Sequence, residues 1–500
     1  SSTSMAISLT NLQSSLNGGL KISSKASSSF ISSTRSLLIL SSMLVFAFMI
    51  CSGLEAGYVG DSINDLHQDI LRDVSVARLT ELGKISDAEN YLKRTFLSPA
   101  SMKAINLIRQ WMEDAGLTTW VDGMGNVHGR AGGMNASSET LIIGSHLDTV
   151  VDAGIFDGSL GIVSALSALK VLHISGELKK LRQPVEVIAF SDEEGVRFQT
   201  TFLGSAAIAG ILPVSALQIS DKSGVTIQDV LMENSMETTE ENWFQIRYDP
   251  KSVWGYVEVH IEQGPVLESI GLPLGVVNGI AGQTRLKVTV RGSQGHAGTV
   301  PMSMRQDPMA AAAELIVSLE GVCQHPEDFL TYDGHCGFSV GSLVCTVGEL
   351  SCWPGASNVI PGQVTFSVDL RALDDLGRKA VIYELSDQMY RICERRSVSC
   401  TIELKHDANA VICDRELSSR LASAAHSAFN KLSGEEVQSE VPVLMSGAGH
   451  DAMAMSRLTK VGMLFVRCRG GSSHSPAEHV SDDDVWAAGS AVLAFLRTFT

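Results

Sequence analysis

A histidine and two aspartates lie close together in residues 144–161, at His146, Asp148 and Asp157, with glycines between and around them. They follow an apolar run at residues 139–144 that predicts a buried strand. Imidazole and carboxylate groups are side chains that bind divalent metals in hydrolases. Because ligands collect in loops at the ends of strands, this spacing indicates a metal site at the end of a sheet.

A second acidic cluster, Ser-Asp-Glu193-Glu194-Gly, follows another apolar run at residues 185–190. Side chains of adjacent residues point in different directions, so one glutamate can bind metal while the other faces the nucleophilic water as a general base. Asp148 can fix the tautomer of His146 by hydrogen bonding to its second ring nitrogen. Asp157 can bridge two cations, which a histidine cannot. The two clusters therefore suggest a hydrolase with a two-metal centre.

Three further segments place polar side chains after apolar strands, at residues 256–264, 446–451 and 470–479. A lone histidine is usually a surface or core residue, so neither His260 nor His474 by itself indicates a metal ligand. The combination favours a metal site, because all five segments follow apolar strands and contain glycine. Histidines without such a setting are interpreted as structural or surface residues: His67, His173, His325, His335, His406 and His426.

Apolar periodicity predicts the elements that would position these residues. The pattern indicates an α/β fold, because helices at 101–116 and 158–172 alternate with strands at 117–121, 126–130, 139–144 and 185–190. Near residue 282 the pattern changes to an alternating strand at 283–291. The elements then expected are a helix at 307–321, strands at 337–347 and 363–371, a helix at 374–395 and a strand at 397–404. This βαββαβ order describes a small separate domain.

After that unit we expect a helix at 410–432, a buried strand at 461–468 and a closing helix at 482–498. The simplest organisation is a metal-binding domain interrupted by an insertion. Its expected parts are a lead at 1–56, a catalytic domain in two parts, 57–281 and 405–500, and an inserted domain at 282–404.

The net charge of −17 argues against nucleic-acid binding through a general basic field. Residues 1–36 are rich in serine, and an apolar run follows at 37–51. The run is short for a membrane span and fits the core of a secretory signal, which predicts entry into the endoplasmic reticulum. A retained anchor and an organelle transit peptide stay open as alternatives.

The chain has nine cysteines and no C-x-x-C pair, so neither a zinc knuckle nor a thioredoxin motif is supported. Most of the cysteines are expected to be buried free thiols. Some could pair in an oxidising lumen, but the connectivity cannot be read from the sequence.

Together the motifs resemble the M20 metallopeptidase superfamily and, more narrowly, its amidohydrolase/carbamoylase branch. The likeness runs from about residue 80 to the C-terminus, and His260-Ile-Glu-Gln-Gly-Pro and Gly-His296-Ala-Gly-Thr-Val-Pro-Met are the specific segments. The resemblance implies an M20-type catalytic α/β domain with a lid and dimerisation domain inserted in it. It implies metal-dependent hydrolysis of a ureido C–N bond in a small anionic substrate.

The resemblance also assigns roles to individual residues. His146, Asp157 and His260 would hold one metal, while Asp157, Glu194 and His474 would hold the other. Glu193 would be the general base, and Asp148 the partner of His146. Manganese is the metal that the resemblance favours, although imidazole and carboxylate ligands alone allow zinc, cobalt or nickel.

Four positions match substrate contacts of the branch: Gln263, His296, Asn358 and Arg371. Arg371 would pair bidentately with a substrate carboxylate, and His296 would stabilise the oxyanion. The inserted domain would form a homodimer and complete the site across domains or subunits. Members of the branch act on different ureido acids with the same metals and base, so these motifs discriminate weakly between substrates. A non-catalytic binding protein that kept the fold is the rival from another class, and Glu193 beside five ligands argues against it.

Overall fold

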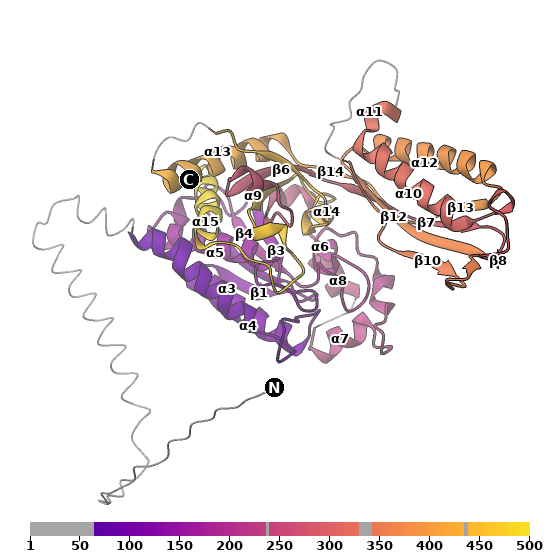
Figure 1. Cartoon of the computed structure of the whole chain (residues 1–500). Helices are drawn as coiled ribbons and strands as arrows, with labels where there is room; N and C mark the ends of the chain where they lie inside the picture. The colour runs from indigo at the N-terminus through magenta and orange to yellow at the C-terminus, as the bar shows by residue number, and fades with distance from the viewer. Residues whose placement is uncertain (1–64, 237–239, 330–342, 435–438) are drawn as a thin grey trace, which may run out of the picture. The chain divides into compact units, whose positions relative to one another are not determined.

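The computed structural model describes residues 65–236, 240–329, 343–434 and 439–500 (Figure 1). The lead at 1–56, including the apolar run at 37–51, lies outside the described residues. Within the described part, no helix combines the length and the apolar character needed to cross a bilayer. Two main sheets with helices packed on them confirm the predicted α/β class.

The larger sheet has four parallel strands at its centre. These are β4, β3, β5 and β16, which are neighbours in that order and are almost wholly buried. Burial on both faces explains their continuous apolar runs. In spatial order the sheet contains β1 (Thr118–Val121), β2 (Val127–Ala131), β4 (Val185–Phe190), β3 (Thr140–His146), β5 (Val253–Ile261), β16 (Val461–Val466), β6 (Leu274–Ile280) and β14 (Val411–Ile412), with β15 (Val443–Ser446) also paired to β6.

Helices pack around this sheet, and α5 is buried along nearly its whole length because it lies against β3, β5 and α15. The helix expected from residue 410 begins at Arg415 instead. Residues 411–412 pair with the sheet edge as β14, and the Asp414 carboxylate caps the helix by accepting from the N–H of Leu417.

The helical segments in this part are η1 (Ile70–Val74), α3 (Ser75–Gly83), α4 (Pro99–Asp114), α5 (Ser159–Ile174), η2 (Leu178–Lys180), α6 (Leu203–Ile208), η3 (Val214–Gln218), α7 (Ile227–Glu233), α8 (Glu240–Ile246), η4 (Pro250–Ser252), α9 (Val266–Ile270), α13 (Arg415–Ser433), α14 (Asp451–Met455), η6 (Arg469–Gly471) and α15 (Asp482–Arg497).

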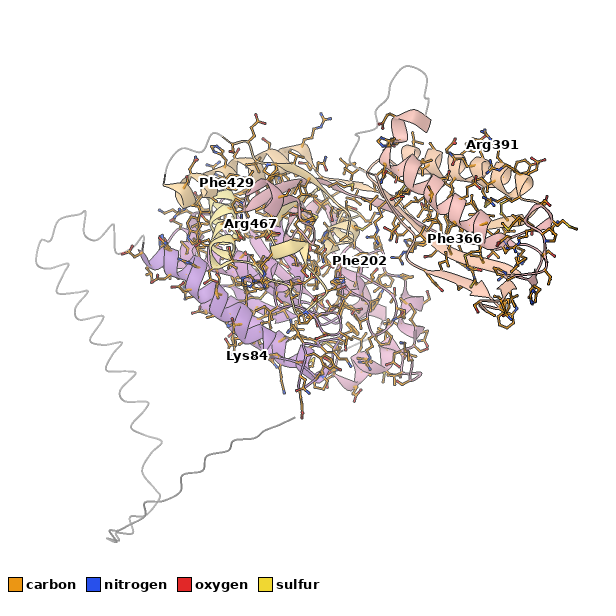
Figure 2. The ribbon with its side chains drawn as sticks, in the orientation of Figure 1. Lys84, Phe202, Phe366, Arg391, Phe429 and Arg467 are labelled. Atoms are coloured by element: carbon orange, nitrogen blue, oxygen red, sulfur yellow. A yellow bond between two sulfur atoms is a disulfide. The ribbon has the colours of Figure 1, made fainter. Side chains whose placement is uncertain are left out.

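The second sheet is antiparallel and has helices α10 and α12 on one face. Alternate residues of β12, such as Phe366, are buried in the core beneath these helices (Figure 2). The residues between them lie on the other face, which we call the open face. The sheet contains β10 (Leu350–Trp353), β12 (Gln363–Ala372), β7 (Gly282–Arg291) and β13 (Ser399–Ala408), with β9 (Leu343–Thr346) also on β12; the accompanying helices are η5 (Met302–Met304), α10 (Pro308–Gln324), α11 (Pro326–Phe329) and α12 (Asp375–Arg395). A separate two-stranded sheet pairs β8 (Gly295–His296) with β11 (Val359–Ile360).

Four cysteines of this second sheet and its helices are paired, so the expectation of mostly free buried thiols was wrong for them. One disulfide joins Cys323 in α10 to Cys345 in β9, and the other joins Cys393 in α12 to Cys400 in β13. Each bridge ties a helix to the sheet beneath it. Such contacts depend on how the helices dock, which sequence spacing does not reveal. The described cysteines without a bridge are the exposed Cys352 and the buried Cys413 and Cys468.

Candidate metal centre

The side chains with metal-ligand chemistry converge at the carboxyl ends of the four central parallel strands. His146 ends β3, and His260 stands next to the last residue of β5. The Glu193–Glu194 pair follows β4, and the loop that carries His474 follows β16. Because neighbouring parallel strands end at the same edge of a sheet, residues far apart in the sequence meet there.

Two groups of three ligand-type side chains share Asp157. In the first, Asp157 Oδ1 lies 3.3 Å from Nε2 of His146 and 3.0 Å from Nε2 of His260. In the second, Asp157 Oδ2 lies 3.4 Å from Nε2 of His474, which lies 3.2 Å from Oε1 of Glu194. Asp157 therefore presents one oxygen to each group, as the predicted bridging carboxylate would.

The fit of these groups to cations rests on the donor atoms themselves. Within each group one ligand atom from every residue lies within 4.8 Å of the others. Oδ1 of Asp157 is buried and has no hydrogen-bond partner in the described part of the chain. A buried carboxylate oxygen without a hydrogen bond, facing two imidazole nitrogens, is suited to a divalent cation.

The histidines are oriented by hydrogen bonds to their other ring nitrogen. Nδ1 of His260 lies 2.9 Å from the Ile261 carbonyl, and Nδ1 of His146 lies 3.1 Å from the Asp148 carbonyl. A proton on each Nδ1 leaves the Nε2 lone pair directed at Asp157 and at a cation beside it. When the rings instead carry a second proton on Nε2, the charge of His260 and hydrogen bonds from the imidazoles hold the pKa of Asp157 well below its ordinary range, although burial alone would raise it.

Asp148 does more than face His146. Its Oδ1 lies 3.5 Å from Nδ1 of His146, and its two oxygens accept from the backbone N–H groups of Glu193 (2.9 Å) and Glu194 (3.2 Å). The carboxylate therefore fixes the acidic loop relative to the histidine. Glu193, which is buried, forms a further possible ligand group with His146 and Glu194. Burial raises the pKa of Glu193 well above its ordinary range, so the side chain can hold a proton.

Glu478 was not assigned a role from the sequence, yet it secures the loop of the bridging carboxylate. Its Oε1 accepts from the N–H groups of Phe156 (2.8 Å) and Asp157 (3.0 Å). The Ser473 hydroxyl lies within hydrogen-bonding distance of both Glu478 and Asp157. Gln263 donates to Oδ2 of Asp157 at 2.9 Å. The only signal in the sequence was the position of Glu478 in the segment that also carries His474.

The backbone around the ligands is unusual at three positions. Gly158 follows Asp157 with φ +66°, and a Cβ there would lie 2.4 Å from the His146 carbonyl oxygen, so only glycine allows the loop to approach β3. His474 and Gln263 also adopt left-handed conformations, with φ of 54° and 57°. Residues with a Cβ adopt this region at a cost, and such positions cluster at functional sites.

The structure places only two of the four substrate residues predicted from the sequence at the cavity. Gln263 and Arg371 line a cavity of about 340 Å³ together with the ligand-type residues and Glu193. His296 and Asn358 do not line it. His296 ends β8 and Asn358 directly precedes β11; both residues are exposed, and the N–H of Ala297 donates to the Asn358 carbonyl.

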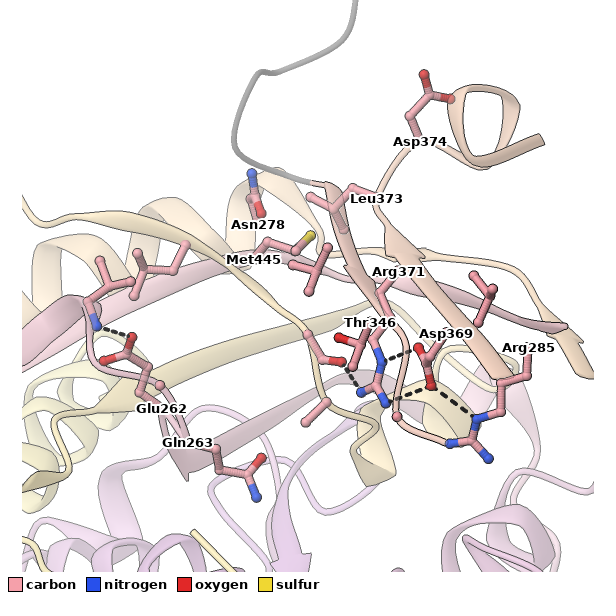
Figure 3. A pocket seen from close by; sticks show the side chains of 18 of the residues that line it. Glu262, Gln263, Asn278, Arg285, Thr346, Asp369, Arg371, Leu373, Asp374 and Met445 are labelled. Carbon is pink, nitrogen blue, oxygen red and sulfur yellow. Dashed lines mark hydrogen bonds and ion pairs between the residues drawn. The ribbon is translucent and has the colours of Figure 1, made fainter. Parts of the chain in front are cut away.

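Two residues on the cavity wall were not predicted from the sequence to lie there. Arg285 and His406 line it from β7 and β13; His406 is exposed, in keeping with a surface position, and also borders the cavity. An adjoining cavity of about 1180 Å³ shares Gln263, Arg285 and Arg371 with the first (Figure 3). No local pattern marked His406, because its position on the wall depends on how β13 pairs with β7.

Comparisons with known proteins place the fold and the site in a family. The model of Peptidase family M20/M25/M40 matches residues 142–498, and the chain belongs to this family. It is 72% identical over 454 residues to allantoate deiminase 1 of Glycine max, covering 90% of this chain and 94% of the relative. It is 70% identical over 440 residues to allantoate deiminase of Arabidopsis thaliana, covering 87% and 84%.

Among solved structures, a hydantoinase/carbamoylase family amidase from Burkholderia multivorans superposes with a TM-score of 0.75 at 27% sequence identity. The match covers 85% of this chain and 97% of that one. Family and fold therefore agree with the resemblance in the motifs.

Proposed function

We propose that this chain hydrolyses allantoate, converting one ureido group and water into ammonia and carbon dioxide and leaving ureidoglycine. The observation that carries the proposal is the ligand cluster with Glu193 beside it, in a chain 72% identical to a plant allantoate deiminase over nearly its whole length. The acidic chain, with arginines confined to one wall of the cavity, also suits a small anionic substrate.

The residues around the cavity can perform each step. Divalent cations, when bound, would supply the Lewis acidity that makes water a nucleophile at neutral pH. Glu193 would take a proton from the water attacking the ureido carbonyl, then deliver it to the substrate nitrogen as the C–N bond breaks. The released carbamate decomposes to ammonia and carbon dioxide. Arg371 would hold the substrate carboxylate through the remaining N–H groups of its two terminal nitrogens, since its guanidinium already donates to Asp369 and to the Gly447 carbonyl.

Two manganese ions are the proposed metal complement. One would bind at His146, Asp157 and His260, and the other at Asp157, Glu194 and His474. Imidazole and carboxylate ligands suit manganese but also several other divalent ions. Elemental analysis of purified protein should give about two equivalents of metal, as two ligand groups imply. One equivalent, or none after incubation with manganese, would contradict the two-metal centre.

A homodimer formed through the inserted domain is proposed as the complete enzyme. His296 and Asn358 are exposed and outside the cavity of their own chain, so a second chain could present them to it. Leu376, Tyr383 and Tyr390 are more than half exposed and lie seven residues apart along α12, which gives an apolar line available for contact.

Subunit mixing tests this dimer. If His296 acts in the partner's site, Glu193→Gln and His296→Ala should each be inactive alone. Unfolded and refolded together, the two variants should regain activity in hybrid dimers, where one site has both native residues. No recovery from mixed dimers would show that His296 does not act across subunits.

Location in the endoplasmic reticulum is also proposed. The apolar run at 37–51 supports it, and so do the two disulfides, because such bridges persist in oxidising compartments. A fluorescent protein fused behind residues 1–56 should enter the reticulum. A fusion that stays in the cytosol would exclude this route.

The decisive test of the reaction is ammonia release from allantoate by purified protein, with and without manganese. Ureidoglycolate, N-carbamoyl-β-alanine and an N-carbamoyl amino acid serve as comparison substrates. The proposal predicts the highest kcat/KM with allantoate and loss of activity after chelation. Preference for another ureido acid would reassign the substrate, and no hydrolysis of any of them in the metal-loaded protein would favour a binding role.

A further inference from the structure

One exposed loop carries a sequence motif that the proposed reaction does not use. Residues 135–137 read Asn135-Ala-Ser137, and this is the only place in the chain where an asparagine stands two positions before a serine or threonine. An asparagine followed by any residue except proline, and then by serine or threonine, is the acceptor motif for N-linked glycans. The motif lies in the loop of residues 132–139, between β2 and β3.

The side chains of this motif are accessible in the folded chain. Asn135, Ala136 and Ser137 are all exposed. Oδ1 of Asn135 accepts from the backbone N–H of Ser137 at 3.2 Å. In the part of the chain that the structure describes, neither Nδ2 of Asn135 nor the Ser137 hydroxyl has a hydrogen-bond partner. A sugar attached to Nδ2 would therefore break no hydrogen bond of the fold.

The loop is held at its base and projects at the motif. The N–H of Met134 donates to the Leu181 carbonyl at 2.6 Å, and Gly133 has φ +64° with its Cα close to the Gln183 carbonyl. Beyond this base, Met134 is 66% exposed although its side chain is apolar. A glycan is bulky and solubilising, so the surface around Met134 both has room for one and would be covered by it.

This loop lies at the end of β3 opposite the metal centre. β3 begins at Thr140, shortly after Asn135, and ends at His146. Its seven residues span about 20 Å, because a strand rises about 3.3 Å per residue. The ligand-type residues collect at the carboxyl ends of the central strands, whereas Asn135 precedes an amino end. A glycan here leaves the cavity of the metal centre open.

The proposed compartment supplies the remaining condition for glycosylation. N-linked glycans are added in the lumen of the endoplasmic reticulum, so an acceptor motif has meaning only in a chain that enters it. The apolar run at 37–51 and the two disulfides support that entry. The chain would therefore meet a membrane-bound transferase and its donor, an oligosaccharide linked to a lipid through a diphosphate.

We propose that Asn135 carries an N-linked glycan. The inference rests on the proposed location in the endoplasmic reticulum. Nδ2 of Asn135 attacks the first carbon of the donor sugar, so that a C–N bond forms and the C–O bond to the diphosphate breaks. The lipid diphosphate leaves with the electron pair of that bond, and the amide loses one of its two protons to the transferase. The attached glycan covers the exposed surface around Met134.

The test uses the full chain expressed in plant cells and digested with endoglycosidase H, which removes the glycans of proteins held in the reticulum. The wild type should shift once in gel mobility, and mass spectrometry should find one remaining N-acetylglucosamine on Asn135. Asn135→Gln and Ser137→Ala should each abolish the shift. Ser137→Thr should keep it, because threonine also completes the motif. Ser138→Ala is the matched control, since this serine lies one position beyond the motif, and it should keep the shift.

Cell fractionation of the same material separates the two proposals. A chain found in the reticulum without a shift would overturn the glycan and leave the location standing. A chain found in the cytosol would overturn the location, and the glycan with it. A shift that persists in Asn135→Gln would place the sugar on another residue and overturn this site.

Discussion

His128 on β2 provides a pH-dependent contribution to stability that can be measured directly. Its buried ring lies between two carboxylates, 2.9 Å from Glu186 and 3.2 Å from Asp122. Glu186 also accepts from Tyr248 at 2.5 Å and from Arg130 at 3.0 Å. Burial alone would lower the pKa of His128, but the hydrogen bonds and charges of Asp122 and Glu186 raise it to about 9. The ring is therefore an imidazolium at neutral pH.

The direction of the pH effect follows from that raised pKa. In the unfolded chain His128 has its usual pKa of 6.5, so it binds its proton more tightly when folded. The contribution is complete below about pH 6.5 and is lost as the pH rises through about 9. Since one pKa unit is worth about 1.4 kcal/mol, the loss amounts to about 3 kcal/mol. Tyr248 does not complicate this range, because burial and the charge of Glu186 raise the pKa of its hydroxyl.

The assay is equilibrium urea unfolding of the wild type and His128→Gln at several pH values, which cancels groups that titrate equally in both proteins. The advantage of the wild type in free energy of unfolding should shrink by about 3 kcal/mol between about pH 6 and pH 10. His173→Gln, at an exposed position outside this network, serves as the control. A wild-type advantage that stays constant with pH would show that His128 is not held as an imidazolium, and would refute the reasoning.

Three further perturbations test the site and the second sheet. Glu193→Gln should keep metal bound but lower kcat by at least about 100-fold, because the general base is lost; an active, metal-loaded variant would exclude this role. Glu478→Gln should raise the Kd for manganese by about 10- to 100-fold, because the carboxylate that accepts from two backbone N–H groups of the Asp157 loop is replaced by an amide. The Kd is measured by competition with a chelating dye, and an unchanged value would show that Glu478 contributes only packing. Replacing Cys323 and Cys345 by serine should lower the stability of the second sheet and its helices by about 3 kcal/mol, since the bridge closes a loop of sequence separation 22. Urea unfolding of the variant and of the oxidised wild type measures this loss, and equal midpoints would mean that the bridge does not stabilise this part of the chain.

The sequence was sufficient to predict the features that are determined by residues close together in the chain. Apolar runs end at His146, before Glu193 and before His474, and a run that ends in polar residues marks the edge of a buried sheet wherever it lies. The predicted α/β class and the family are confirmed for this reason. The structure also brings the five predicted ligand residues within reach of each other.

Features that depend on tertiary pairing could not be predicted. His406 faces the cavity only because Lys405 is an extra residue against β7. The Cys393–Cys400 bridge requires α12 to dock on β13, and cysteine spacing does not encode that contact. Glu478 acts on backbone N–H groups of a loop more than 300 positions away in the sequence. In each case the residue's partner is set by tertiary packing, and the periodicity of apolar residues does not identify it.

The left-handed backbone at His474 and Gln263 limits how far this enzyme can be made more robust. Glycine at either position would relieve about 1 kcal/mol of conformational strain. Glycine has neither a ring nitrogen nor an amide, so the same change would remove a ligand-type side chain or the hydrogen bond to Asp157. Directed evolution for heat tolerance alone should therefore reach glycine at these two positions and lose turnover, whereas selection for activity should retain the strained residues. The two positions mark where durability and catalysis compete in this chain.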